Sequence, residues 1–221
     1  MNYYLDLFSP ETAKAFTKSN QDISGFRISR KAYIENKSIS PGDKFICYCT
    51  RIQRFIGVLE VQSPPFIDRK PIFTEDEDPF ILRFKVKVQI WLPLDKAILI
   101  HNDSIWNQLS FTKNLSKDSN RWTFMVFSSP MLWPKEDCEY IEHVLIKQSK
   151  ELVTYPFSES DEKKLKPTKI RISSRKEISV SVPDNEEERS IQEKVSKTKE
   201  QRDSMDISVI LTPKTALLTP L

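Results

Sequence analysis

The alternation of hydrophobic and polar residues is clearest between residues 81 and 91. Leu82, Phe84, Val86, Val88 and Ile90 alternate with Arg83, Lys85, Lys87 and Gln89. A period of two places these two sets on opposite faces of a β-strand. We therefore expect a half-exposed strand in an antiparallel or mixed sheet, with the three basic residues on a solvated face.

Further strands are predicted over residues 2–8, 44–50, 54–62 and 122–127. The strands 44–50 and 54–62 are joined by a short, tight connection, and the segment 41–43 (Pro-Gly-Asp) forms a turn before them. Gly57 lies inside a strand, where a missing side chain costs stability, so it indicates a bulge or a close approach of another group. Residues 24–27 are expected to form a loop.

Helix signals alternate with these strands. Ser9, Pro10 and Glu11 provide a hydroxyl N-cap, a proline at the first helical position and an acid in the first turn, which predicts a helix to about residue 19. One short helix is expected after the 24–27 loop, ending at about residue 36, and another is expected over residues 103–109. A final helix begins near Pro134, with Cys138, Ile141 and Leu145 on its inward stripe. The predicted fold class is α+β, a strongly bent mixed sheet of five or six strands with helices packed outside.

The composition changes sharply along the 221 residues. Every Phe, Tyr and Trp lies at or before Phe157, and residues 158–221 contain no aromatic residue and no glycine but 13 Lys or Arg and 12 Asp or Glu. Such a segment buries too little apolar surface to offset its ordering entropy. We divide the chain into a folded domain, 1–150, and a charged, mostly disordered extension, 151–221, with a frayed helix over about 185–201.

Several protein classes are excluded by simple counts. Only 3 glycines are present, so neither type of glycine-rich phosphate loop can be written. The 3 cysteines, an odd number, argue against a disulfide framework and fit a reducing cytoplasm. No apolar run is long enough for a transmembrane helix, and the start lacks the pattern of a signal peptide. We expect a cytoplasmic protein without a membrane partner.

Catalytic and metal-binding constellations are not apparent. His101 and His143 are far apart and belong to no ligand motif, and Cys47 and Cys49 are typical of small core residues on one strand face. The acidic run 75–78 lacks the spacing of a calcium loop. We expect no enzymatic activity, no metal and no cofactor.

A binding function is favoured instead. Tyr48, Trp106, Phe111 and Trp122 either belong to the core or wall a pocket for a planar base, and periodicity does not decide between these. Basic residues cluster in sequence around the 24–27 loop and the 50–54 connection: Arg27, Arg30, Lys31, Arg51 and Arg54. The net charge of +3 is too small for bulk coating of nucleic acid but allows a local basic rim that contacts phosphates.

The order of these segments resembles the EVE domains of the PUA-like superfamily, whose relatives include the YTH, ASCH and SRA modules. The resemblance covers about residues 2–148. It rests on an ordered set of short motifs: Tyr4-Leu5, Ser24-Gly25-Phe26-Arg27, Pro41-Gly42-Asp43, Cys47-Tyr48-Cys49-Thr50, the segment 55–61, Pro65-Phe66-Ile67-Asp68 and Phe127-Ser128-Ser129-Pro130. The chain departs from the family before Gly25, where Ile23 and Ser24 stand and the family's tryptophan is missing, and after Arg27, where Ile28 replaces an asparagine.

The resemblance implies a PUA-like open barrel that holds a flipped, modified nucleobase. Its ligand would be modified cytosine in DNA, with RNA as the alternative, and such domains often belong to bacterial defence or restriction systems. The implied binding residues are Ser24, Gly25, Phe26, Arg27, Tyr48, Thr50, Ser128 and Ser129, to which the residue analysis adds Trp106 and Trp122.

Two other functions stay open at this point. One is a protein-interaction module with a vestigial pocket, in which the charged extension binds an effector protein. The other is a nuclease or base-processing enzyme built on the same fold.

Overall fold

A curled sheet forms the centre of the protein in the computed structural model, which describes residues 1–73 and 79–166. Its main path runs in the order β2-β6-β4-β3-β1-β8, while β5 pairs with β6 and β7 pairs with β4. The strands are β1 (Tyr3–Phe8), β2 (Ile23–Phe26), β3 (Lys44–Cys49), β4 (Arg54–Val61), β5 (Phe66–Ile67), β6 (Leu82–Trp91), β7 (Ile98–Leu99) and β8 (Met131–Leu132). β1 and β3 are parallel and the other pairs are antiparallel, so the predicted mixed sheet is confirmed.

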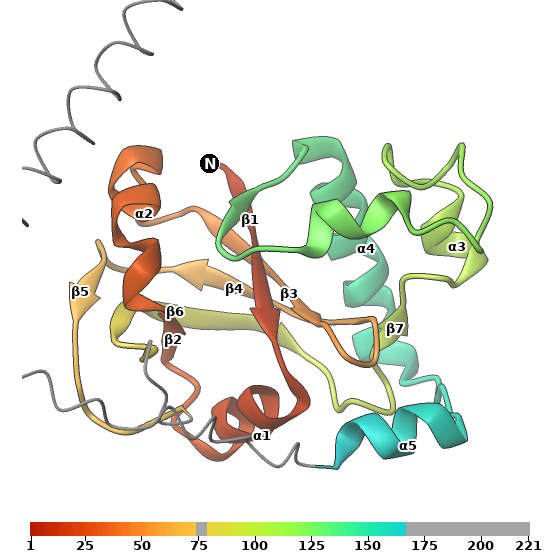
Figure 1. The fold of residues 1–221 in the computed structure, drawn as a ribbon, viewed down its shortest axis with the longest axis horizontal. Helices are drawn as coiled ribbons and strands as arrows, with labels where there is room; N and C mark the ends of the chain where they lie inside the picture. The colour runs from red at the N-terminus through yellow and green to blue at the C-terminus, as the bar shows by residue number, and fades with distance from the viewer. Residues whose placement is uncertain (74–78, 167–221) are drawn as a thin grey trace, which may run out of the picture. The chain divides into compact units, whose positions relative to one another are not determined.

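Helices cover both faces of this sheet (Figure 1). They are α1 (Pro10–Lys18), the 3-10 helix η1 (Ile28–Arg30), α2 (Lys31–Lys37), α3 (Asp103–Trp106), the 3-10 helix η2 (Arg121–Val126), α4 (Lys135–Glu151) and α5 (Glu159–Leu165). The predicted N-cap is confirmed, because Ser9 accepts a hydrogen bond from the backbone N–H of Thr12. Among the described residues, no helix is long and apolar enough to cross a lipid bilayer.

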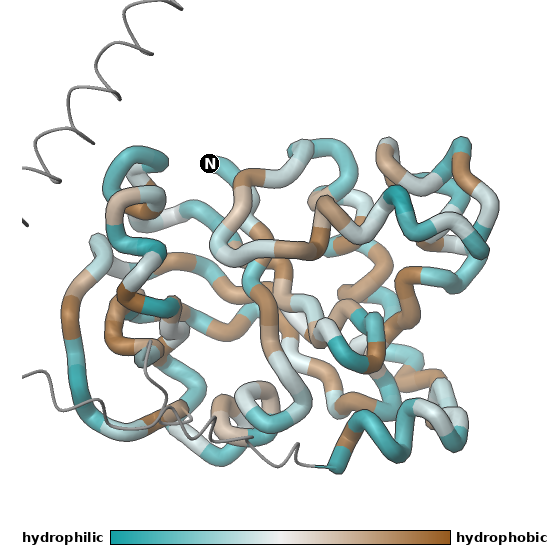
Figure 2. Tube along the Cα trace, viewed as in Figure 1, coloured by the Kyte–Doolittle hydropathy of each residue, from teal (hydrophilic) through white to brown (hydrophobic). Residues whose placement is uncertain are grey.

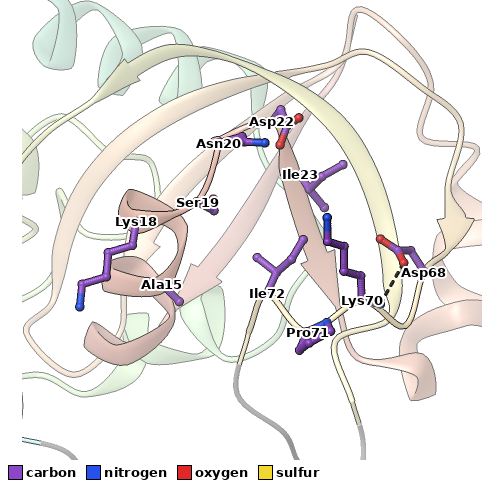
Figure 3. A pocket seen from close by; sticks show the side chains of 10 residues that line it. All are labelled: Ala15, Lys18, Ser19, Asn20, Asp22, Ile23, Asp68, Lys70, Pro71 and Ile72. Carbon is purple, nitrogen blue, oxygen red and sulfur yellow. Dashed lines mark hydrogen bonds between the residues drawn. The ribbon is translucent and has the colours of Figure 1, made fainter.

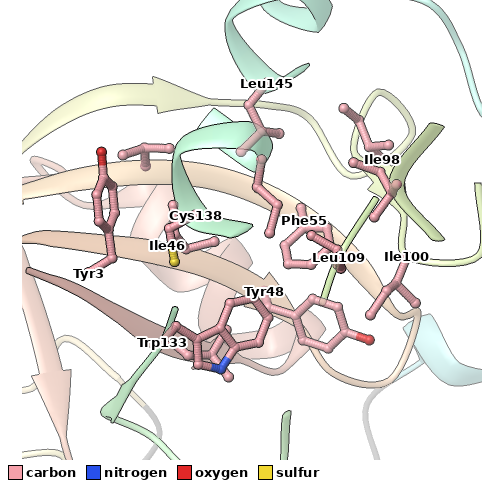
Figure 4. Close-up of a cluster of buried hydrophobic side chains, with 14 of the residues drawn as sticks. Tyr3, Ile46, Tyr48, Phe55, Ile98, Ile100, Leu109, Trp133, Cys138 and Leu145 are labelled. Atoms are coloured by element: carbon pink, nitrogen blue, oxygen red, sulfur yellow. The ribbon is translucent and has the colours of Figure 1, made fainter. Parts of the chain in front are cut away.

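Alternation along β1 divides the core into two clusters. Tyr3 and Leu5 pack with α3 and α4, whereas Tyr4 and Phe8 face the opposite cluster, which includes α1 and α2. Figure 4 shows the first cluster, where Cys138 and Leu145 of α4 lie over the strands. In Figure 2 the hydrophobic positions follow the central strands, while α5 is largely hydrophilic. The predicted inward stripe of α4 is fully buried.

The curl of the sheet brings two strands together that are not neighbours in its order. β2 lies at one end of the strand order and β1 lies near the other. Ser24 of β2 donates a hydrogen bond of 2.6 Å to the carboxylate of Asp6 on β1, and both side chains are buried. We call this junction the seam of the half-barrel, and the candidate site lies beside it.

The predicted tight spot at Gly57 is confirmed. A Cβ atom placed on Gly57 would overlap the carbonyl oxygen of Ile90 and lie 2.9 Å from the Trp91 ring. Register shifts occur next to it, between Val58 and Leu59 and between Cys47 and Tyr48. A glycine therefore lets β6 approach β4 closely where both strands bend.

Two local predictions were wrong. Residues 23–26 form strand β2 rather than a loop, because they pair with residues 82–85 of β6, and Gly25 leaves room for the Phe73 ring, 2.7 Å from where its Cβ would be. The strand predicted over residues 122–127 is also absent, because residues 121–126 form the 3-10 helix η2. Only Trp122 of η2 is buried, so this segment has no continuous apolar face to pair into the sheet.

The predicted solvated stripe on β6 was wrong at one position. Lys85 and Lys87 are exposed, but Arg83 is buried and forms a 2.6 Å ion pair with Asp68. The 64–71 segment covers this end of β6, and alternation within one strand cannot reveal such a cover.

The boundary of the domain lies further along the chain than predicted. Arg54 is fully buried and donates hydrogen bonds to the carbonyl oxygens of Tyr155 (2.7 Å) and Pro156 (3.1 Å). Its guanidinium lies 4.5 Å from the centre of the Phe157 ring and 3.7 Å from the Asp161 carboxylate. Residues 152–166 are therefore part of the fold, because a buried arginine holds their backbone. The remaining extension, 167–221, and the acidic run 75–78 lie outside the described residues.

Candidate nucleic-acid interface

A pocket of about 290 Å³ opens at the seam of the half-barrel, and we call it the seam pocket. Five separate segments of the chain form it. Its lining residues are Leu7, Phe8, Ser9, Gly25, Phe26, Arg27, Arg30, Thr50, Phe80, Phe127, Ser128 and Ser129. This volume is near the lower end of the ~300–1,000 Å³ typical of ligand pockets, which suits one flat group better than an extended cofactor.

The wall at Ser129 is fixed by a buried carboxylate. The Ser129 hydroxyl accepts a 3.1 Å hydrogen bond from the backbone N–H of Leu7 and donates one of 3.4 Å to Asp6. Asp6 also accepts from Ser24, so one side chain connects β1, β2 and the segment before β8. Asp6 therefore positions the pocket wall although it does not line the pocket.

The environment of Asp6 is unusual for an acid. Its side chain is 2% exposed, and the described residues place no cation against it. Burial raises the pKa of Asp6 to about 7, and the hydrogen bonds from Ser24 and Ser129 only partly oppose this. Asp6 can thus change its protonation state near neutral pH.

Two arginines lie at the rim of the seam pocket. The Arg27 guanidinium lies over the Phe80 ring, 4.6 Å from its centre, and that of Arg30 lies 4.6 Å from the centre of the Tyr33 ring. Arg30 also donates to the carbonyl oxygen of Ser129 at 3.2 Å. Both cations are thereby held beside the opening, where phosphates of a nucleic acid could approach them.

The aromatic residues at the pocket differ in their exposure to solvent. Phe26 is buried and packs edge-to-face on Phe45 and Phe84, so it supports the barrel interior. Phe127, by contrast, is 84% exposed. An exposed phenylalanine at the mouth of a pocket is available to stack on a flat ligand.

A second cavity, of about 370 Å³, adjoins the seam pocket, and we call it the Tyr48 cavity. The two share Leu7, Thr50 and Phe127. The other residues that line the Tyr48 cavity are Tyr48, Gln53, Trp122, Thr123 and Val126.

The structure places the ten predicted site residues in four different positions. Six line the seam pocket: Gly25, Phe26, Arg27, Thr50, Ser128 and Ser129. Tyr48 and Trp122 line the adjoining Tyr48 cavity instead. Ser24 lies behind the seam pocket, bonded to Asp6. Trp106 was wrong as a pocket residue, because it is buried, stacks on His101 and donates to the carbonyl oxygen of Leu115.

Sequence reasoning missed Asp6, Phe80 and Phe127 as site residues. Asp6 carries a signal that could have revealed it, since a period of two puts this acid on the same strand face as the apolar Tyr4 and Phe8. Phe80 and Phe127 carry none, because each comes to the pocket through a loop or an irregular segment whose path the sequence does not indicate.

A larger pocket, of about 590 Å³, lies between the end of α1 and the 68–72 loop (Figure 3). No aromatic side chain lines it. Asp22 and Asp68 are its two acids, and Asp68 accepts hydrogen bonds from the Lys70 backbone N–H and from Arg83, so this second carboxylate is already engaged. The pocket therefore offers little for a planar base.

Comparisons with known proteins give structural neighbours only. The sequence matches no family model, and no curated protein matches it. The Mmi1 YTH domain complexed with RNA is 15% identical, over 71% of this chain and 84% of that chain, with a TM-score of 0.49. The YTH domain of Zygosaccharomyces rouxii MRB1 protein, in complex with N6-methyladenosine RNA, is 16% identical, over 65% and 83%, with a TM-score of 0.42. Rpa0253 from Rhodopseudomonas palustris is 13% identical, over 71% and 99%, with a TM-score of 0.38. Membership of the EVE domains stays a prediction.

Proposed function

We propose that this protein is a non-enzymatic reader that holds one modified nucleobase in the seam pocket. The observation that carries this proposal is the meeting of an exposed aromatic ring, two serines and two arginines at one base-sized cavity. Stacking on Phe127 would hold the base, polar groups of the Ser128–Ser129 segment would contact its edge, and Arg27 and Arg30 would meet phosphates. This combination of a stacking ring, polar groups at the base edge and cations for phosphates supports the readout of an extruded base.

The favoured ligand is a modified cytosine in DNA, flipped out of the duplex, and a methylated adenine in RNA is the alternative. The preference for DNA and a role in bacterial defence rest on the resemblance to EVE domains. A cytoplasmic location rests on the cysteine usage. Binding of an effector through the charged extension is also part of the proposal, and residues 167–221 of that extension lie outside the described part.

The test is a titration of the full chain at fixed, moderate salt. The ligands are one duplex with plain, methylated or hydroxymethylated cytosine, and one RNA with plain or methylated adenine. We expect a preference of tenfold or more, about 1.4 kcal/mol, for one modified base over its plain form. Equal, weak binding to every ligand that disappears with salt would show only charge attraction and would overturn the proposal.

Two variants, one within η2 and one directly after it, make the test specific. Phe127→Ala should weaken binding of the modified base about 5- to 150-fold, since stacking contributes about 1–3 kcal/mol per base. Phe124→Ala is the matched control, because this ring is 65% exposed but does not line the pocket. Both variants should unfold at the wild-type temperature. Equal affinities of the two variants for the modified base would show that Phe127 does not contact it.

A further inference from the structure

The Tyr48 cavity contains an unsatisfied polar group. The Tyr48 side chain is 1% exposed, and its hydroxyl has no hydrogen-bond partner among the described residues. A buried hydroxyl without a partner loses its hydration and gains nothing in return. In Figure 4 this hydroxyl points away from Trp133, toward the edge of the cluster. A ligand that brings a donor or acceptor to it would recover the lost hydrogen bond.

The walls of the Tyr48 cavity are rigid. Trp122 is buried and makes edge-to-face contacts with His101 at 5.3 Å and with Trp106 at 6.0 Å, measured between ring centres. Tyr48 packs on Phe55 in the same way at 5.1 Å. Aromatic rings held on several sides do not collapse into an adjacent space, so the cavity persists without a ligand.

Phe127 stands between the two cavities. It lines both of them and is exposed to solvent over most of its surface. Apolar side chains placed in this way in nucleic-acid-binding proteins insert between successive bases and separate them. The two cavities share this wall, so they adjoin one another as neighbouring nucleotides of one strand do.

We propose that the Tyr48 cavity receives the base next to the modified one, with Phe127 between the two bases and the Tyr48 hydroxyl bonded to the polar edge of the second base. This inference rests on the proposed function and adds sequence context to it. The protein then reads a dinucleotide, one base for its modification and its neighbour for its identity.

The test uses the full chain and oligonucleotides that carry the preferred modified base. The nucleotide on its 5′ side, and separately on its 3′ side, is varied among the four bases and an abasic residue. On one side we expect the best base to bind about threefold to tenfold more tightly than the worst, the range that one hydrogen bond provides. The abasic residue should bind at least as weakly as the worst base.

Two matched variants assign this preference to the cavity. Tyr48→Phe should lose the context preference while unfolding at or above the wild-type temperature, since it removes only an unpaired hydroxyl. Tyr140→Phe, whose hydroxyl donates to the carbonyl oxygen of Ser104 on α3, should keep the preference.

The outcomes separate this inference from the proposed function. If the wild type prefers the modified base but binds abasic and intact neighbours equally, the second cavity takes no base and only this inference fails. A context preference that persists in Tyr48→Phe also overturns it. If modified and plain bases bind equally, the proposed function itself fails.

Discussion

Replacing Asp6 by asparagine tests the buried carboxylate behind the seam pocket. Burial raises the pKa of Asp6 from its ordinary value of 3.8 to about 7. The folded protein therefore binds a proton more tightly than the unfolded chain does. The contribution of Asp6 to the free energy of unfolding is greatest below pH 4, falls as the pH rises toward 7 and stays low above pH 7. The full loss is about 4 kcal/mol, since each factor of ten in proton affinity is worth ~1.36 kcal/mol.

The same difference in proton affinity gives the change in the free energy of unfolding over a practical pH range. Between pH 5 and pH 8 the ionisation of Asp6 should lower the free energy of unfolding of the wild type by about 2–3 kcal/mol. Asp6→Asn has nothing to ionise at this position and loses that contribution to the pH dependence. The amide keeps an oxygen that accepts from Ser24, and its N–H can donate to the Ser129 hydroxyl, so the shape of the seam is conserved.

The assay is urea unfolding of the full chain at pH 5 and pH 8 at equal ionic strength. Asp118→Asn is the control, because Asp118 is an exposed acid and its replacement should keep the wild-type pH dependence. The reasoning fails if wild type and Asp6→Asn lose stability equally between the two pH values. In that case Asp6 is solvated or paired in solution, and it does not act as a buried acid.

Three further predictions concern the fold. Gly57→Ala should lower the free energy of unfolding by about 1–3 kcal/mol or more, seen in urea unfolding, because the new methyl overlaps the Ile90 carbonyl oxygen; a stable variant would mean that β4 and β6 are not in close contact. Arg54→Met should cost about 3–5 kcal/mol and speed proteolysis after residue 151, since the carbonyl groups that Arg54 holds lose their donor; unchanged cleavage there would contradict this anchoring. The thiols of Cys47, Cys49 and Cys138 should not react with a thiol reagent until the protein unfolds, because all three are buried and burial raises the pKa of each. Rapid labelling of the native protein would show an open core.

The sequence predicted the elements whose signals are local. The Ser9 cap, the alternation in β6 and the inward stripe of α4 each depend on spacings within one segment, and the structure has all three. Composition failed over residues 152–166, because the anchor of this segment is Arg54, a side chain about 100 residues earlier in the chain. Local propensity also failed at Ile23–Phe26, where only the partner strand β6 creates the strand.

The candidate site was harder to predict than the fold for the same reason. The motif residues Gly25 and Ser129 could be named from their order in the chain, but their meeting at one pocket depends on the curl of the sheet. Trp106 and Phe127 show the limit of composition, since one aromatic residue is sealed in the core and the other is exposed. Aromatic content indicated a base-binding surface without indicating which rings are free.

The junction between β1 and the 128–132 segment has a consequence for how the protein is made. The hydrogen bond from the Leu7 backbone to Ser129 joins residues that are 122 positions apart, and β8 then pairs with β1. Contacts of such high sequence separation close large loops and form late in folding. A nascent chain that has not yet extended past residue 132 therefore has most of the sheet but no completed pocket. The seam pocket is therefore completed only when synthesis of the domain is nearly finished.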